Sequence, residues 1–94
     1  MIQKIKITPE ESANVENLFK TYTSYMTVLQ FFMNQEEITN QTIFDKKWNE
    51  AIEINKDLEK AKRDIEKKYK PAGKWDRFEF DFDNHEVVFT RNGA

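Results

Sequence analysis

Hydrophobic residues recur every three or four positions over two long stretches of the chain, and this spacing predicts two helices. The first helix is expected at about residues 9–34, because Thr8 can cap its first turn and Glu11 completes a capping box with it. The second is expected at about residues 42–69 and is ended by Pro71. Two long helices with a short connector are expected to pack antiparallel as a hairpin.

Two other stretches alternate hydrophobic and polar residues, as β-strands do. A short strand is expected at about residues 2–7. The C-terminal sequence KWDRFEFDFDNHEVVFTR predicts a β-hairpin at about residues 75–91, with residues 83–84 as a two-residue turn. In this register Phe80 lies opposite Val87, and nearly all the hydrophobic residues of the hairpin share one face.

The expected fold class is therefore α+β, with the element order β-α-α-β-β in one domain covering residues 1–94. A two-stranded ribbon alone is only marginally stable in water, so the C-terminal hairpin must pack against other elements. We expect it to lie against part of the helical hairpin, with the N-terminal strand joining it to form a small antiparallel sheet.

The composition narrows the class of protein. The chain contains no cysteine, which excludes disulfides, cysteine-based zinc sites and a thiol nucleophile. Its first residues lack the hydrophobic stretch of a signal peptide, and no hydrophobic run approaches the ~20 residues needed to cross a bilayer. The net charge of -2 provides no general attraction to nucleic acid or anionic lipid. We expect a soluble, cytoplasmic protein without membrane contact.

The sequence shows no pattern typical of a catalytic or ligand-binding site. His85 is the single histidine, and one histidine without cysteine does not make a conventional zinc site. A general base would also need an orienting partner and a cleft. Two glycines cannot build a phosphate-binding loop. We therefore expect no enzymatic activity, no bound metal and no cofactor.

The charged face of the C-terminal hairpin, which we call the acidic ribbon, is one candidate surface for binding a partner protein. Asp81 falls opposite Glu86, and like charges on neighbouring strands repel each other mildly. A basic partner would relieve this repulsion, although a solvated, charged edge that discourages aggregation is the other interpretation. Trp75 is expected on the same face and favours binding, because tryptophan often anchors interfaces. The candidate residues of the ribbon are Trp75, Arg77, Glu79, Asp81, Asp83 and Glu86.

The sequence YMTVLQFFM at residues 25–33 is a second candidate surface, because its hydrophobic residues cover nearly the whole circumference of the first helix. A helix that is hydrophobic all round is buried all round. Either the second helix and the sheet enclose this segment, or part of it, including Phe31, binds a partner protein or a second copy of the chain.

The second helix offers a third candidate. Residues 56–70 hold seven Lys and Arg residues against four Asp and Glu residues, and the lysines could contact phosphate groups. The acidic residues lie among them at salt-bridge spacing, which favours a solvated face instead. Asn55 lies where the hydrophobic stripe of this helix would place an apolar residue. It either fixes the register from a buried position or points outward.

Three segments carry a resemblance to a known group of proteins. They are ITPEE at the start of the first helix, LEKAKRDIEKKYKP at the end of the second, and the terminal hairpin FEFDFDNHEVVF. In these segments the chain resembles small uncharacterised proteins of phages and mobile elements in low-GC Gram-positive bacteria. The resemblance implies an accessory or anti-defence role exerted by binding.

The function expected from the sequence is that of a small non-enzymatic protein-interaction module that acts by stoichiometric binding. Its partner would be a protein, with a host nuclease or another basic defence protein as one target. Two alternatives stay open. One is a nucleic-acid or nucleotide-ligand binder that uses the cationic end of the second helix, and the other is a structural homo-oligomer of helical hairpins.

Overall fold

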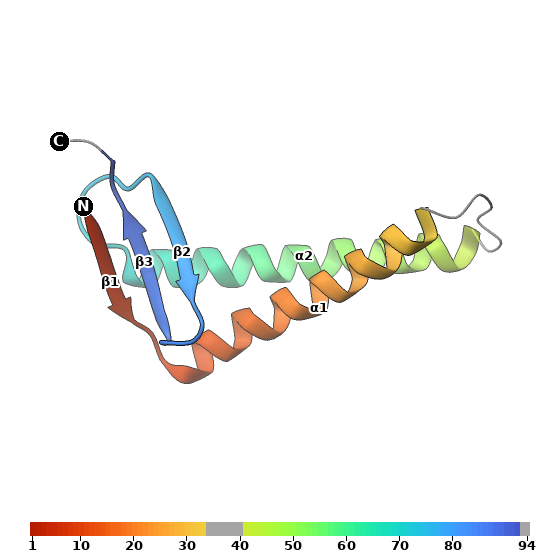
Figure 1. The fold of residues 1–94 in the computed structure, drawn as a ribbon, viewed down its shortest axis with the longest axis horizontal. Coiled ribbons are helices and arrows are strands. Elements are labelled where there is room, and N and C mark those ends of the chain that lie inside the picture. The colour runs from red at the N-terminus through yellow and green to blue at the C-terminus, as the bar shows by residue number, and fades with distance from the viewer. Residues whose placement is uncertain (34–40, 93–94) are drawn as a thin grey trace.

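The computed structural model describes residues 1–33 and 41–92 and confirms the α+β fold (Figure 1). The elements are β1 (Ile2–Lys6), α1 (Pro9–Met33), α2 (Gln41–Tyr69), β2 (Arg77–Asp81) and β3 (Glu86–Thr90). Their bounds are close to those expected from the sequence. Residue 34, expected as the end of the first helix, and the connector up to residue 40 lie outside the described residues.

The three strands form one antiparallel sheet in the order β1-β3-β2, so the N-terminal strand completes the sheet as expected. Phe80 of β2 lies opposite Val87 of the central strand, which confirms the predicted register of the C-terminal hairpin. Ile5 of β1 lies opposite Val87 from the other side. Since side chains alternate between the faces of a sheet, the hydrophobic residues of the three strands share one face, except Ile2 and Val88, which lie on the other.

The turn between β2 and β3 differs from the expected two-residue turn. Four residues, 82–85, separate the strands, and of these four His85 alone has a positive φ, of 52°. A two-residue type I′ turn would need a positive φ at both of its central residues. The Asp81 carboxylate instead accepts hydrogen bonds from the Asn84 backbone N–H and side-chain amide, at 3.2 and 2.8 Å. Both kinds of turn leave Asp81 opposite Glu86, so the register is unaffected.

The sheet lies across one end of the helical hairpin, where α1 and α2 diverge (Figure 1). Its hydrophobic face and the two helices enclose a core in which Phe89 is fully buried. The Phe89 ring lies 4.9 Å from the ring of Phe78 and 5.9 Å from that of Trp75, between ring centroids. The buried members of this core are Ile7, Val15, Leu58, Ile65, Val87 and Phe89.

The rest of the helical hairpin extends beyond the sheet. The chain measures 53 × 30 × 20 Å, and its radius of gyration of 17.0 Å exceeds the roughly 12 Å of a compact chain of this length. Leu29 and Ala51 are buried in this extension but do not belong to the core that the sheet covers. The sheet therefore does not reach residues 25–33. The expectation that this segment is enclosed between α2 and the sheet is wrong.

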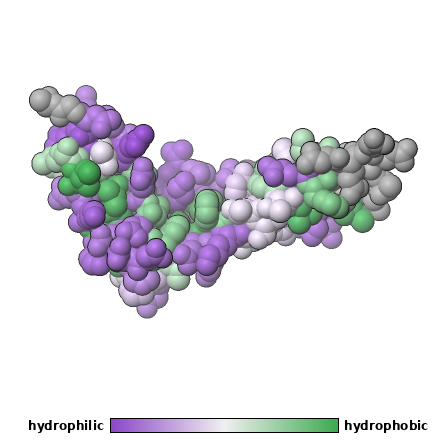
Figure 2. Space-filling view, viewed as in Figure 1, coloured by the Kyte–Doolittle hydropathy of each residue, from purple (hydrophilic) through white to green (hydrophobic). Residues whose placement is uncertain are grey.

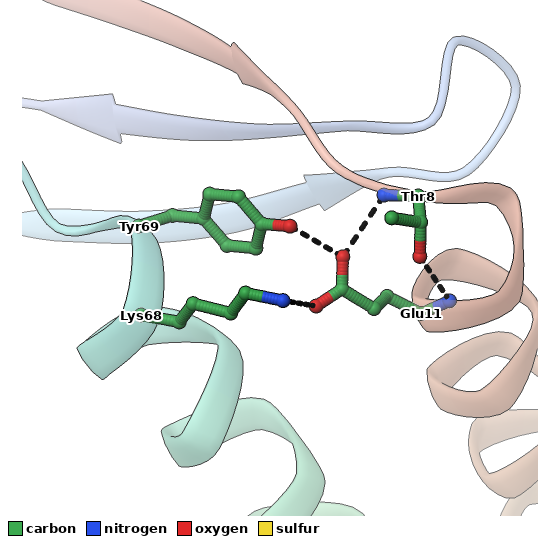
Figure 3. Close-up of polar contacts among 4 residues, drawn as sticks. All are labelled: Thr8, Glu11, Lys68 and Tyr69. Carbon is green, nitrogen blue, oxygen red and sulfur yellow. Dashed lines mark hydrogen bonds and ion pairs between the residues drawn. The ribbon is translucent and has the colours of Figure 1, made fainter.

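Glu11 joins the start of α1 to the end of α2 at the sheet-covered end (Figure 3). The Glu11 backbone N–H donates to Thr8 Oγ1 at 3.1 Å, and the Thr8 backbone N–H donates to Glu11 Oε1 at 2.9 Å, which confirms the predicted capping box. The same carboxylate accepts hydrogen bonds from the Tyr69 hydroxyl and from Lys68 Nζ, the latter at 2.9 Å. One side chain thus caps one helix and holds the last turn of the other.

These contacts set the charge state of the Glu11 carboxyl group. Partial burial by itself raises its pKa, but the hydrogen bonds from Tyr69, Thr8 and Lys68 outweigh burial and lower the pKa from 4.5 to about 2. The carboxylate in turn raises the pKa of Lys68 and of Tyr69, because each donates a hydrogen bond to it. A carboxyl group whose pKa is lower in the folded state stabilises the fold wherever it is ionised.

We expect Glu11→Gln to remove a pH-dependent part of the stability. In the unmodified protein, the contribution of Glu11 is complete above pH 4.5 and is lost as the pH falls through about 2, because the folded-state pKa is the lower one. The variant should be less stable at pH 7 by about 1–2 kcal/mol, the range for an exposed, charge-assisted hydrogen bond. Urea unfolding between pH 2 and pH 7 measures the free energy of unfolding of the unmodified protein and of the variant.

The difference in stability between the two proteins should shrink as the pH falls from 4.5 to 2. A difference that stays constant over this range would contradict the assigned role of the charge. Glu10→Gln is a suitable control, because Glu10 is the exposed neighbour in the same first turn of α1.

Candidate protein-interaction surface

The outer face of the sheet carries as many positive as negative side chains, because β1 contributes two lysines. Glu86 of β3 lies between Lys6 of β1 and Asp81 of β2, so the predicted pairing of Asp81 with Glu86 is confirmed. Lys6 Nζ lies 3.0 Å from Glu86 Oε1. The charged residues of this face are Lys4, Lys6, Arg77, Glu79, Asp81 and Glu86.

The repulsion between Asp81 and Glu86 is relieved within the chain. The side-chain hydrogen bond from Asn84 is the main reason why the pKa of Asp81 is lowered, and the nearby charge of Lys4 acts in the same direction. The ion pair with Lys6 offsets the negative charge of Glu86. The charges of the acidic ribbon therefore do not require a basic partner, and the sequence missed this because the pairing of β1 with β3 joins segments far apart in the chain.

Trp75 does not lie on the outer face of the sheet, and this expectation from the sequence is wrong. Its ring packs edge-on against Phe89, and its indole N–H donates to the Pro71 carbonyl at 3.2 Å. The Arg91 guanidinium covers the ring at 4.8 Å from its centroid. The alternation that placed Trp75 outside applies only within a strand, and β2 begins two residues later, at Arg77.

The other predicted residues lie at opposite ends of the molecule. Arg77, Glu79 and Asp83 are exposed at the sheet, whereas Phe31 is 64% exposed near the end of α1 that lies far from the sheet. The structure thus does not bring the acidic ribbon and the hydrophobic segment of α1 into one site. They are two separate surfaces.

A groove of about 280 Å³ lies between α1 and α2 beyond the sheet, and we call it the distal groove. Tyr22 and Met26 line it from α1, and Trp48 and Ile52 line it from α2. Figure 2 shows hydrophobic surface on the part of the hairpin that extends beyond the sheet. The remaining lining residues are Ala51, Asn55 and Lys56.

The distal groove continues the face of the hairpin that the sheet covers. Trp48, Ile52 and Asn55 follow one another on α2 at a spacing of four and three, which places them on one stripe. Continuing at this spacing, the stripe reaches Glu59, which lines a hollow together with Phe78 of the sheet. Tyr22 packs against the core and also lines the groove. The groove is therefore the part of this face that lies past the sheet.

Large hydrophobic side chains remain exposed around the groove. Trp48 is 43% exposed and Ile52 is 40% exposed. Single exposed hydrophobic residues are common on soluble proteins, but a cluster that lines a concavity is typical of a binding site. Asn55 is half-buried at the edge of the groove, so it is neither a fully buried register residue nor a fully exposed one.

The opposite side of the hairpin has a wider hollow of about 660 Å³, and polar contacts join the two helices there. The Tyr25 hydroxyl donates to Glu50 Oε2 at 2.8 Å, and Lys47 Nζ lies 3.7 Å from the same carboxylate oxygen. The hydrogen bond raises the pKa of Tyr25 and lowers that of Glu50. Lys47 also lies over the Tyr25 ring, 5.5 Å from its centroid. The two sides of the hairpin therefore differ, because mainly charged and amide residues line this hollow, whereas mainly hydrophobic residues line the distal groove.

Three lysines in the C-terminal half of α2 are paired with acidic residues, which is typical of a solvated face. Lys56 Nζ lies 3.3 Å from Glu53 Oε1, and Lys62 Nζ lies 3.4 Å from Glu59 Oε1. Lys68 forms an ion pair with Glu11, with 2.9 Å between Nζ and Oε2. These pairs reduce the positive potential that phosphate binding by the cationic end of α2 would require.

Comparison with protein-family models, with curated proteins and with solved structures gave no match. Within residues 1–33 and 41–92, no helix combines the length and hydrophobicity needed to span a membrane. The same residues contain no cluster of three or more His, Asp or Glu side chains that could hold a metal ion. The surfaces of the molecule are therefore the basis for a proposed function.

We expect Asp81→Lys to destabilise the protein, because it removes the acceptor of both hydrogen bonds from Asn84 and leaves the turn at residues 82–85 without its side-chain support. Glu79→Lys is the matched control, since it makes the same change of charge on the same strand and the same face. The melting temperature should fall by a few degrees for Asp81→Lys and stay nearly constant for Glu79→Lys. Equal effects would show that Asp81 acts only through its charge.

Proposed function

We propose that the protein is a non-enzymatic interaction module that binds another protein stoichiometrically, with the distal groove as its binding surface. The observation that carries this proposal is the concavity that the sheet leaves open, which is lined by exposed Trp48 and Ile52 and by half-buried Met26. Covering these side chains would remove hydrophobic surface from water, at roughly 25 cal/mol per Å².

The shape of the groove favours a helical segment as its occupant. It runs between two antiparallel helices, and an amphipathic helix can place its hydrophobic residues into such a groove at a spacing of three and four. Lys56 is the charged residue of the lining, so an acidic residue beside the hydrophobic positions would suit the partner. Met26 adds an adaptable wall, because methionine fits hydrophobic surfaces of different shapes.

The acidic ribbon supports binding less well than the groove does. Its carboxylates are balanced by the lysines of β1, and Trp75 belongs to the core rather than to the outer face. A basic target is therefore not required by the charges of the sheet. The resemblance to small phage and mobile-element proteins makes a host defence protein a candidate partner, which the groove would engage through hydrophobic contacts.

We expect Ile52→Glu to abolish binding of the partner, because it places a charge at a hydrophobic contact that binding would remove from water. The dissociation constant should rise at least tenfold, which corresponds to about 1.4 kcal/mol. Proteins captured from the native cell by the unmodified chain should be absent from the capture by Ile52→Glu. Calorimetry with the purified partner should give a ratio of one to one.

Asn49→Glu is the matched control, since it introduces the same charge on α2 at a residue that lines the opposite side of the hairpin with Tyr25. Both variants should keep the circular dichroism spectrum and the melting temperature of the unmodified chain, because Ile52 and Asn49 are exposed. A partner retained by Ile52→Glu, or lost equally in both variants, would contradict binding through the groove.

A further inference from the structure

The C-terminal half of α1 has no charged residue from Thr21 to Met33, although much of it is exposed. At the mean content of the chain, 34%, a stretch of this length would hold several charged residues. Figure 2 shows the corresponding change, from hydrophilic surface at the sheet end to pale, weakly polar surface in the middle of the hairpin. The outward face of a helix in a soluble monomer is normally charged or strongly polar.

Three hydroxyl groups of this segment donate hydrogen bonds to the helix backbone. Thr21 Oγ1 donates to the Asn17 carbonyl at 2.8 Å, and Ser24 Oγ donates to the Lys20 carbonyl at 3.0 Å. Thr27 Oγ1 likewise donates to the backbone carbonyl of Thr23, at 3.0 Å. A hydroxyl that donates within its helix does not need water as an acceptor. The exposed surface here is therefore less polar than its residue names suggest.

Four of these residues form a stripe that we call the outer seam. They are Thr21, Ser24, Val28 and Phe31. Their spacing of three, four and three is that of a helix-packing seam. At about 100° per residue, the seam lies on the side of α1 opposite Met26 and hence opposite the distal groove.

We propose that two copies of the chain pair through the outer seams of their α1 helices, with the helices antiparallel. The sizes of the four side chains support this arrangement. The seam has small residues at its N-terminal half and larger ones at its C-terminal half. An antiparallel pair with its two-fold axis level with residue 26 sets Phe31 against Thr21 of the other copy, and Val28 against Ser24. Large residues then face small ones in every layer, as close packing requires.

A second copy is the occupant that the charges favour. Two uncharged seams approach without repulsion, whereas a partner that recognises the chain by charge finds no opposite charge along Thr21–Phe31. A parallel pair would set Phe31 against Phe31 and Ser24 against Ser24, which leaves one layer crowded and another empty. The contact spans only three turns of each helix, so the interface is small, below about 1,200 Å² in total, and we expect a dissociation constant in the micromolar range.

This inference is independent of the proposed function, because the two surfaces lie on opposite sides of α1. Pairing through the outer seam leaves both distal grooves accessible. Each outcome can therefore be read separately: a groove variant tests the binding of another protein, and a seam variant tests the association of two copies.

The association state of the unmodified chain and two variants tests the proposal. Light scattering and sedimentation should show a monomer that becomes a dimer as the concentration rises through the micromolar range. Val28→Glu should weaken the dimer at least tenfold, because it places a charge in each of two layers. Val28 is 42% exposed in the single chain, so this variant should keep its fold and melting temperature at low concentration. Gln30→Glu adds the same charge outside the seam and should leave the dimer intact.

Cross-linking tests the antiparallel register, and the absence of cysteine makes single-cysteine variants clean probes. Ser24→Cys and Val28→Cys are prepared separately, with tags of different mass, then mixed and oxidised. An antiparallel pair brings residue 24 of one chain level with residue 28 of the other, so the mixed disulfide should predominate. A parallel pair would give the two symmetric disulfides.

Four results would overturn the proposal. One is a chain that remains monomeric at millimolar concentration. Another is a dimer that Val28→Glu leaves intact or that Ile52→Glu dissociates, since either would place the contact away from the seam. The third is a predominance of symmetric disulfides, which would exclude the antiparallel register. A monomer that loses a different protein on Val28→Glu would assign the seam to that protein and would equally contradict pairing of two copies.

Discussion

The width of the three-stranded sheet is much smaller than the length of the two helices that it covers. The remaining features of this protein follow from this difference. The strands run across the helices, so the sheet covers them only over its width, about 14 Å for three strands at their usual spacing (Figure 1). α1, with 25 residues, is about 37 Å long, and α2 is longer. More than half of the helical hairpin must therefore be stabilised by the contact between its two helices alone.

The two halves of the hairpin are stabilised in different ways. At the sheet end, Phe89 fills a three-sided core, and Glu11 fixes the first turn of α1 to the last turn of α2. Beyond the sheet, Leu29 and Ala51 are buried between the helices. The hydrogen bond from the Tyr25 hydroxyl to the Glu50 carboxylate joins the helices on the side opposite the distal groove. A pair of short helices is marginally stable in isolation, so this half depends on the continuity of both helices with the covered half. Additional burial by a bound protein would stabilise it directly.

Local signals predicted most of the fold. The capping box at Thr8 and the alternation around Phe80 each depend on neighbouring residues, and both elements formed as expected. The failures concern contacts between distant segments. Trp75 precedes the strand whose alternation was applied to it, and the lysines of β1 reach the acidic ribbon only through the pairing of the first strand with the last. The direction of the strands across the helices is likewise not encoded locally, so the sequence could not indicate where the sheet would end or that a groove would begin there.

The fold alone does not account for the uncharged surface beyond the sheet. Substitutions at exposed helical positions usually change stability little, so Lys or Glu could stand at positions such as Thr23, Thr27 or Val28 without loss of the helix, and would increase solubility. The other exposed faces of this chain carry such residues in abundance, including the outer side of α2. The half of α1 beyond the sheet avoids charge on both sides, with a hydrophobic groove on one and the outer seam on the other. The contacts proposed above would account for this absence of charge. The length of the hairpin then has a physical reason, because the part that the sheet cannot cover is the part that remains available for binding.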